Sequence, residues 1–304
     1  MDTKTIAIIG VGHVGATIAY SLIAKNIPCN IILVDADQQR CMSELGDLED
    51  SLLFSSAIGT VTLGTIAQAA HADIILITAG MPQKPAQPRS ELLETNTQII
   101  EDIAQNLTAI NPRAIVIVVS NPVDALTAQL SAKKLVPAHQ LFGAGTLLDT
   151  MRLRVLLAQR FKVPYDHIDA FVFGEHGETQ FIPWSLVRIN GKEIAQLSFS
   201  PQELDDIAQK IRTKVYSIIE GKLYTYYGIA SGIAQVCKAI IFDEKTVFPA
   251  SHYSEQWGVF LSTPCVIGQS GIERVVDFTL TEREQAQMNR SAQALKAMMA
   301  PWLP

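Results

Sequence analysis

Residues 6–15 of the chain read IAIIGVGHVG, an unbroken apolar run followed by three glycines in the spacing G-x-G-x-x-G. The apolar run predicts a parallel strand that is buried on both faces. A helical pattern follows from Ala16 to Lys25, and a second apolar run, Ile31–Val34, ends at Asp35. The segment therefore predicts a strand–turn–helix–strand unit with the glycines at its turn.

Such a unit is typical of dinucleotide binding when an acid follows the last glycine by about twenty residues. Asp35 lies twenty positions after the third glycine. Its carboxylate would accept from both hydroxyls of an adenosine ribose and repel a 2′-phosphate, which favours NAD over NADP. The candidate cofactor contacts of this unit are Gly10, Gly12, His13, Val14, Gly15 and Asp35. Arg40 is a further candidate near the adenosine end, with an uninvolved surface cation as the alternative reading.

The alternation of strands and helices continues to about residue 145. Apolar strands are predicted over residues 73–78 and 114–119, with a helix over 91–110 between them. This order predicts an α/β fold with a right-handed, doubly wound parallel (Rossmann) sheet. Ligands on such sheets bind beyond the carboxyl ends of the strands. That rule adds the strand ends Thr78, Ala79, Gly80, Val119, Ser120 and Asn121 to the cofactor candidates.

A mixed α+β pattern replaces this alternation in the second half. We therefore expect a dinucleotide-binding domain over residues 1–145 and a substrate and catalytic domain over residues 146–304. The elements predicted there are a helix from near 146, a strand over 168–173, a hairpin at 190–191, a helical tract over 201–241 interrupted at Gly221, short strands near 257–261, 265–267 and 275–278, and a helix from 281.

His176 is the candidate proton-transfer residue of the second half. Gly174 and Gly177 flank it in a tight turn at the end of the predicted strand. An imidazole has an unperturbed pKa of about 6.5, so it exchanges protons near neutral pH. An isolated loop histidine is more often structural, so this interpretation depends on the neighbouring residues.

Two charged residues on one face of the helix near 146 can supply those neighbours. Asp149 and Arg152 are three positions apart, which by itself suggests a surface ion pair worth a few tenths of a kcal/mol. Alternatively, Asp149 would orient the far nitrogen of His176, and Arg152 would offer its fork to a substrate carboxylate. The loop over 81–89 carries three prolines and no acid. It is either a stiff connection or a lid that delivers Gln83 and Arg89.

Composition limits the other function classes. The chain has 304 residues, 48% of them hydrophobic and 18% charged, with a net charge of −6. This balance argues against a large nucleic-acid surface. No apolar run reaches 18 residues and no secretory signal pattern precedes the first strand, so we expect a soluble, cytoplasmic protein without a membrane partner. The four cysteines show no metal-ligand spacing, so we expect reduced structural thiols and no metal.

These motifs occur in one order that resembles the L-lactate/malate dehydrogenase family over essentially the whole chain. The motifs are the glycine turn with Asp35, AGxxQKP over 79–85 with Arg89, SNPVD over 120–124, LDxxR over 148–152 and GEHG over 174–177. The resemblance implies that His176 is the acid/base, Asp149 its orienter, Arg152 the carboxylate clamp and Arg89 the group that polarises the substrate carbonyl. It also implies substrate contacts by Asn121 and Thr225, and a homotetramer.

Substrate choice within the family depends on position 83. Malate dehydrogenases carry Arg there to meet a second carboxylate, whereas this chain has Gln83. The resemblance therefore implies a small monocarboxylic 2-keto or 2-hydroxy acid, with pyruvate and lactate first. The loop Pro85–Arg89 departs from the usual sequence of lactate dehydrogenases. Gln180-Phe181 and Glu49-Asp50 resemble L-2-hydroxyisocaproate dehydrogenases, so longer or branched acids are the alternative. A malate dehydrogenase and a catalytically silent nucleotide-binding protein are further alternatives.

Allosteric bacterial members of the family bind fructose 1,6-bisphosphate with an Arg and a His. Arg154 matches the Arg, but Asp169 stands at the position of the His. Because a carboxylate repels a phosphate, we expect little or no activation by this sugar bisphosphate.

Overall fold

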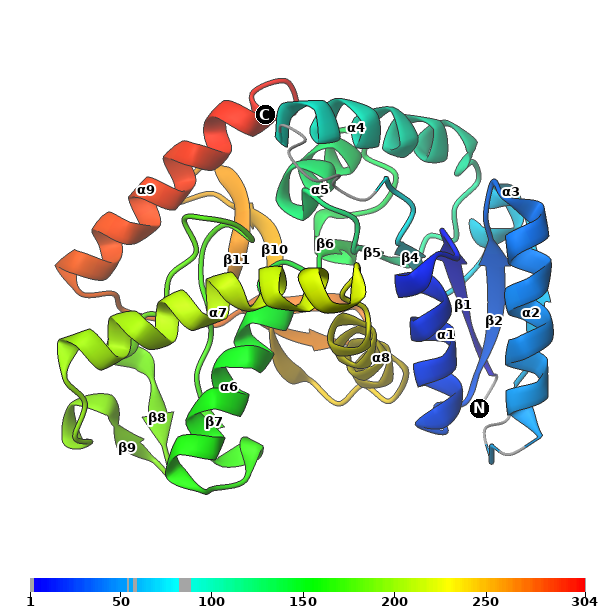
Figure 1. Cartoon of the computed structure of the whole chain (residues 1–304). Coiled ribbons are helices and arrows are strands. Elements are labelled where there is room, and N and C mark those ends of the chain that lie inside the picture. The colour runs from blue at the N-terminus through cyan, green and yellow to red at the C-terminus, as the bar shows by residue number, and fades with distance from the viewer. Residues whose placement is uncertain (1–2, 54, 57–58, 82–88, 304) are drawn as a thin grey trace.

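A computed structural model describes residues 3–53, 55–56, 59–81 and 89–303, with the side chains of 89–92 excepted. In these ranges the main sheet has nine strands in the order β12-β11-β10-β6-β5-β4-β1-β2-β3 (Figure 1). The six strands from β3 to β6 are parallel. They are β1 (Lys4–Ile9), β2 (Cys29–Val34), β3 (Val61–Leu63), β4 (Ile74–Ile77), β5 (Ile115–Val118) and β6 (Leu141–Gly143). The order 3-2-1-4-5-6 is that of the doubly wound dinucleotide-binding fold, so the predicted fold class is confirmed.

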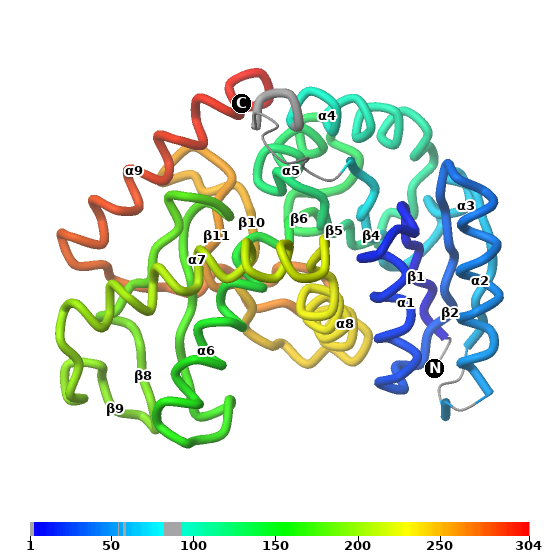
Figure 2. Tube along the Cα trace, in the orientation of Figure 1, coloured from blue at the N-terminus to red at the C-terminus, as the bar shows by residue number. Residues whose placement is uncertain are grey.

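Alternating side chains of each parallel strand explain why its apolar run is unbroken. In β1, Ile6 and Ile8 pack on one face with α1 (His13–Ala24), α2 (Gln38–Leu52) and α8 (Tyr227–Ile241). Ala7 and Ile9 pack on the other face with α3 (Ile66–Ala69), α4 (Arg89–Asn106) and α5 (Val123–Ala132). A strand covered on both faces has no polar side to present. Figure 2 shows α8, from the second half of the chain, running beside α1.

Antiparallel strands of the second half extend the same sheet. They are β10 (Thr246–Ser254), β11 (Val259–Gly268) and β12 (Gly271–Val275). The strand β10 joins the parallel part by pairing Ser251 with Gly143 of β6. A small second sheet is formed by β7 (Ile168–Asp169), β8 (Arg188–Ile189) and β9 (Lys192–Glu193). The helices described in this half are α6 (Leu147–Phe161), α7 (Pro201–Lys222), α8 and α9 (Glu282–Met299). Short 3-10 turns lie at 165–167, 184–186 and 194–196, and one in the first half lies at 138–140.

Several predicted elements of the second half are confirmed. The turn between β8 and β9 has Asn190 and Gly191 at positive φ, 51° and 75°, as a two-residue hairpin of this type requires. Thr281 caps α9 by accepting from the N–H of Glu284, and the Glu284 carboxylate accepts from the N–H of Thr281 in return. The helix from Thr281 is therefore present where the sequence predicts it.

Other predicted boundaries were wrong. The long helical tract breaks at Leu223, which has φ +70°, and not at Gly221, which stays helical. One glycine costs a helix only about 1 kcal/mol relative to alanine, which is too little to end it. The predicted strands near 257–261 and 265–267 form one strand, β11, in which Pro264 lies opposite Pro249 of β10. The strand β10 lacks polar–apolar alternation because most of it is buried, and we did not predict it.

The predicted strand over 168–173 is only partly formed. Its first two residues make β7, whereas Phe173 pairs with Phe181 and Gly174 with Ser262 of β11. The segment therefore changes partners along its length and crosses from the small sheet to the large one. It reaches β11 of the large sheet two residues before His176.

Candidate functional site

The glycine turn after β1 has the close backbone contacts that the spacing predicts. Gly10 has φ +100°, and a side chain there would collide with the backbone of Ala79 at the end of β4. A side chain at Gly15 would collide with the carbonyl oxygen of Gly10. At Gly12, by contrast, the nearest atom to an added Cβ is a guanidinium nitrogen of Arg40, 4.0 Å away. The second glycine therefore borders open space, as needed for a pyrophosphate to approach the backbone.

The start of α1 fits a bound dinucleotide. Gly12 is its N-cap, no side chain caps the helix, and no acid lies in its first turn, so its free N–H groups favour an anion. At the end of β2, Asp35 accepts from the main-chain N–H groups of Val11 (2.6 Å) and Asp37 (2.9 Å). These bonds hold the carboxylate beside the turn and leave lone pairs for ribose hydroxyls.

Hydroxyl groups tie the neighbouring strand ends to this turn. Thr78 donates to the carbonyl of Gly10 (2.5 Å), and Ser120 donates to the carbonyl of Ala79 (2.6 Å). The candidates of β1, β2, β4 and β5 thus meet at one edge of the sheet. The His13 ring lies 4.6 Å from the ring of Tyr224. This contact joins the glycine turn to the break between α7 and α8.

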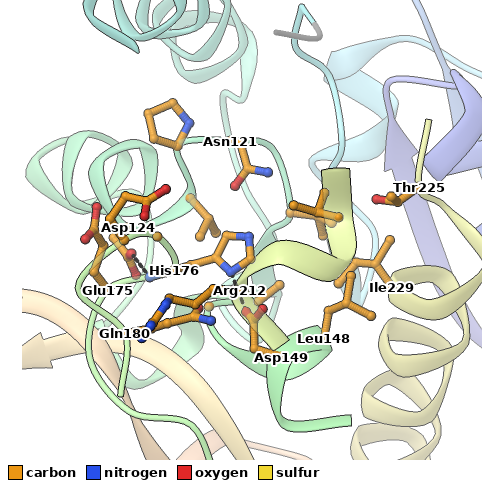
Figure 3. Close-up of a pocket in the computed structure, with 18 of the residues that line it drawn as sticks. Asn121, Asp124, Leu148, Asp149, Glu175, His176, Gln180, Arg212, Thr225 and Ile229 are labelled. Carbon is orange, nitrogen blue, oxygen red and sulfur yellow. Dashed lines mark hydrogen bonds and ion pairs between the residues drawn. The ribbon is translucent and has the colours of Figure 1, made fainter. Parts of the chain in front are cut away.

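A cavity of about 310 Å³ opens beside the turn and is lined by both halves of the chain (Figure 3). The sequence-predicted residues that line it are Val14, Val119, Asn121, Asp149, Arg152, His176 and Thr225. Thr225 comes from the break between α7 and α8, and Asn121 from the end of β5. Residues predicted separately as cofactor and substrate contacts therefore share one cavity.

His176 and Asp149 form a hydrogen-bonded pair in this cavity. The imidazole Nδ1 lies 2.7 Å from Oδ2 of Asp149, which is 3% exposed. Burial acts to raise the pKa of Asp149, but His176, Arg152 and the Gln180 amide offset it and hold that pKa below its usual range. Burial acts to lower the pKa of His176, whereas the carboxylates of Asp149 and Asp124 raise it above its usual value. Both shifts favour an imidazolium–carboxylate pair.

Arg152 lies against the same carboxylate. Its Nη1 is 3.4 Å from Oδ1 of Asp149, and the residue is 7% exposed. Burial lowers the pKa of Arg152, and Asp149 counteracts this. Within the described residues Asp149 is the one ion-pair partner of Arg152, and the contact is long for a charged hydrogen bond. Most of the donors of this guanidinium are thus available to an anion in the cavity.

The loop that carries His176 is held by three distant elements. Gly174 exchanges main-chain hydrogen bonds with Ser262 of β11. The N–H of Glu175 donates to Oγ of Ser291 on α9 (2.7 Å), and the N–H of His176 donates to Asp124 on α5 (2.8 Å). Gly174 has φ +88°, and a side chain there would collide with Ser291. These anchors were not predicted as site residues, because a serine in a strand or helix has many structural uses.

Asn96 is a second residue that we did not predict. It is 2% exposed on α4, and its amide bonds the main chain of Met81 on both sides, at 2.7 and 3.2 Å. The same amide donates to the carbonyl of Asn121 (2.7 Å). Asn96 therefore links Met81, four residues after the end of β4, to Asn121 on the substrate side of the cavity. Gln83 and the side chain of Arg89 lie outside the described residues, although the helix α4 begins at Arg89.

Arg154 and Asp169, the two positions compared with the effector site of the family, do not line this cavity. Arg154 donates from Nε to the carbonyl of Ala170 (3.0 Å), and its guanidinium lies over the Phe171 ring, 4.6 Å from the centroid. Asp169 is exposed at the edge of the small sheet. The four cysteines are buried and free, as predicted. None of the described helices is long and apolar enough to span a bilayer.

The fold and the cavity define an oxidoreductase that uses a dinucleotide. Comparison with known families narrows this class. The model of the lactate/malate dehydrogenase NAD binding domain matches residues 4–143, and that of the alpha/beta C-terminal domain matches residues 146–303. The chain belongs to the lactate/malate dehydrogenase family, and its cofactor is NAD.

Relatives and solved structures agree with this assignment. The chain is 37% identical to L-lactate dehydrogenase A of Rhizopus oryzae over 96% of this chain and 91% of that protein. It is 35% identical to the L-lactate dehydrogenase of Bacillus velezensis over 97% and 96%, respectively. The structure of a minor L-lactate dehydrogenase from Enterococcus mundtii, in a ligand-bound form, superimposes with a TM-score of 0.94 at 31% identity, covering 98% of both chains.

Proposed function

We propose that this protein is an L-lactate dehydrogenase, which interconverts pyruvate and L-lactate with NADH and NAD. The observation that carries the proposal is the 2.7 Å contact between His176 and Asp149 in a cavity that Arg152 and Val14 of the glycine turn also line. Proton donor, carboxylate-binding cation and dinucleotide turn are the parts that this reaction requires. The names of the relatives point to the same activity.

The residues present fit NAD. The uncapped first turn of α1 and the open space at Gly12 would accept the pyrophosphate, and Asp35 would accept the adenosine ribose. We further propose that Arg40 lies at the adenosine end and that Val119, Ser120 and Asn121 approach the nicotinamide. The bound cofactor supplies or accepts the hydride.

The proton is handled by His176. A carboxylate can only accept, so Nδ1 donates to Asp149 and Nε2 is left to exchange a proton with the substrate oxygen. Asp149 also stabilises the imidazolium, and hence the proton donor needed for pyruvate reduction. A positioned acid of this kind contributes about 10²–10⁴ in rate.

The other substrate contacts are assigned from the charge and the position of the residues that line the cavity. Arg152 would bind the substrate carboxylate, and Thr225 and Asn121 would border the reacting carbons. We propose, from the resemblance in sequence, that Arg89 polarises the carbonyl, adding about 3–4 kcal/mol by analogy with an oxyanion-hole donor. Gln83 offers no charge to a second carboxylate, which would lose several kcal/mol in a dry site.

The test is a series of kcat/KM values, followed by NADH absorbance, over pyruvate, 2-ketobutyrate, 2-ketoisocaproate, phenylpyruvate and oxaloacetate. We expect pyruvate to be the best substrate and oxaloacetate to be about a thousandfold poorer. A maximum at 2-ketoisocaproate would indicate the branched-acid alternative. No turnover of any of these acids would contradict the proposal.

We also propose a homotetramer, a cytoplasmic location and a domain boundary near residue 145. The tetramer rests on the family resemblance, and the location on the lack of an apolar run of 18 residues or more in the sequence. The boundary rests on the change of pattern and on the two family models, which meet between 143 and 146. Light scattering after gel filtration tests the assembly, and limited proteolysis tests the boundary.

A further inference from the structure

Asp124 is a buried carboxylate that the proposed mechanism does not use. It lies in the first turn of α5 and is 3% exposed. One oxygen, Oδ2, accepts from the main-chain N–H of His176 at 2.8 Å. The other, Oδ1, accepts from Oγ of Ser251 at 2.5 Å, and Ser251 is fully buried in β10. Figure 3 shows Asp124 and Asp149 approaching His176 from different sides.

The position of Asp124 suggests a helix cap, but its contacts do not. The N-cap of α5 is Pro122, which has no side-chain cap, and in the described chain the side-chain hydrogen bonds of Asp124 go to His176 and Ser251. A buried carboxylate costs several kcal/mol unless hydrogen bonds or opposite charges compensate it. The hydrogen bonds that compensate the burial of Asp124 therefore go to the histidine loop and to Ser251, and none of them caps α5.

Holding the loop does not by itself explain a charge at this point. Gly174 and Glu175 are already anchored to Ser262 and Ser291. A neutral amide could accept the N–H of His176 equally well. What only a carboxylate adds is a negative charge next to the imidazole.

The effect of this negative charge on the pKa of His176 depends on the other charges around the imidazole. Among the described residues these are Asp149 and Arg152 on α6, Glu175 and Glu178 on its own loop, and Arg212 on α7. Asp149 and Asp124 raise the pKa of His176, and Arg152 opposes them. Burial raises the pKa of Asp124 to about 6, although Ser251 and the His176 N–H act to lower it. Asp124 is thus mainly anionic at neutral pH, where it favours the imidazolium.

We propose that Asp124, held by Ser251, is a positioning residue for His176: it fixes the main-chain N–H and places a second negative charge beside the imidazole. The inference rests on the proposed function, because it concerns the same proton transfer. In this arrangement two carboxylates orient one histidine: Asp149 bonds the imidazole ring, and Asp124 bonds the main-chain N–H.

The Asp124→Asn variant separates charge from shape. Its amide oxygen can still accept from His176, and its amide N–H can donate to Ser251, so both hydrogen bonds remain possible. We expect NADH affinity, measured by fluorescence, to stay within twofold of the wild type. We expect the pKa of His176, followed by NMR of the ring protons, to fall by about one unit. In pyruvate reduction, the alkaline limb of the kcat profile should move to lower pH by the same amount, because that direction needs the imidazolium.

Two further variants keep the result interpretable. Thr127→Val alters a buried residue of the same helix whose hydroxyl bonds Val123 of α5, and it should leave the pKa of His176 unchanged. Ser251→Ala retains Asp124 but removes the hydrogen bond that favours its ionised form. It should also lower the pKa of His176, but by less than Asp124→Asn does. If the Asn variant fails to fold, Ser251→Ala takes its place in the test.

The NMR titration does not depend on turnover, so the inference and the proposed function can fail separately. An unchanged pKa of His176 in both Asp124→Asn and Ser251→Ala would overturn the inference, even if the wild type reduces pyruvate. A lowered pKa in an enzyme that reduces no 2-keto acid would retain the inference about the charge and refute the proposed function.

Discussion

The glycine turn and the histidine loop border the same cavity, but they are built in different ways. The turn works through backbone shape: Gly10 and Gly15 are needed because neighbouring main-chain atoms leave no room for a side chain. The loop works through side chains that converge from α5, α6, β10 and α9. The glycine turn can thus be recognised from the local spacing of its residues, whereas the contacts of the histidine loop form only when distant elements pack together.

The largest effect should come from His176→Gln, which removes the imidazole from the histidine loop and leaves the glycine turn unchanged. Without an imidazolium no group donates the proton to the carbonyl oxygen, so kcat for pyruvate reduction should fall by about 10²–10⁴. The dissociation constant of NADH should be unchanged, since the groups proposed to hold the pyrophosphate and the adenosine ribose lie in the glycine turn and at Asp35. Steady-state kinetics and NADH fluorescence measure the two values. An unchanged kcat would remove His176 from the mechanism.

The converse substitution, Gly15→Ala, breaks the turn and leaves the loop intact. The added methyl would collide with the carbonyl of Gly10, so α1 must move away from β1. We expect a loss of about 1–3 kcal/mol in the free energy of unfolding, as for an overpacked core, together with weaker NADH binding. Urea denaturation and fluorescence titration test this. Gly46→Ala, at a position with nothing within 4 Å of the added methyl, is the matched control and should bind NADH as the wild type does.

These two sites also differ in how far they could be predicted. The turn and its acid follow from local spacing, so Gly10, Gly12, Gly15 and Asp35 could be placed by sequence pattern alone. The pair of His176 and Asp149 could be proposed because the family motifs contain both residues, although their 27-residue separation fixes no geometry.

The anchors Asp124, Ser251 and Ser291 could not be predicted as such. They become neighbours of the loop only when β10 and α9 pack against the parallel sheet. The helix break at Leu223 was also missed, because leucine rarely adopts a positive φ and no residue preference marks the position.

The pH dependence should distinguish the two reaction directions. The pKa of His176 is raised, so its protonated form persists above pH 6.5. Pyruvate reduction should therefore hold its rate up to that pH and decline as the pH rises through the raised pKa. Lactate oxidation needs the neutral imidazole and should rise over the same range. Initial rates in both directions between pH 5 and 9 test this, and identical profiles would contradict it.

The smallest effect expected is that of fructose 1,6-bisphosphate. Arg154 is engaged with Ala170 and Phe171, and the exposed Asp169 would repel a phosphate. The apparent KM for pyruvate at neutral pH should change less than twofold on titration with the sugar bisphosphate. A tenfold decrease would show that an effector site exists despite Asp169.

The most direct test of the whole account is a crystal structure with NADH and oxamate, an unreactive isostere of pyruvate. We predict that Nε2 of His176 lies within hydrogen-bond distance of the oxamate carbonyl oxygen and that Arg152 binds its carboxylate in a bidentate manner. An oxamate carboxylate bound elsewhere, or an imidazole turned away from the ligand, would contradict the account.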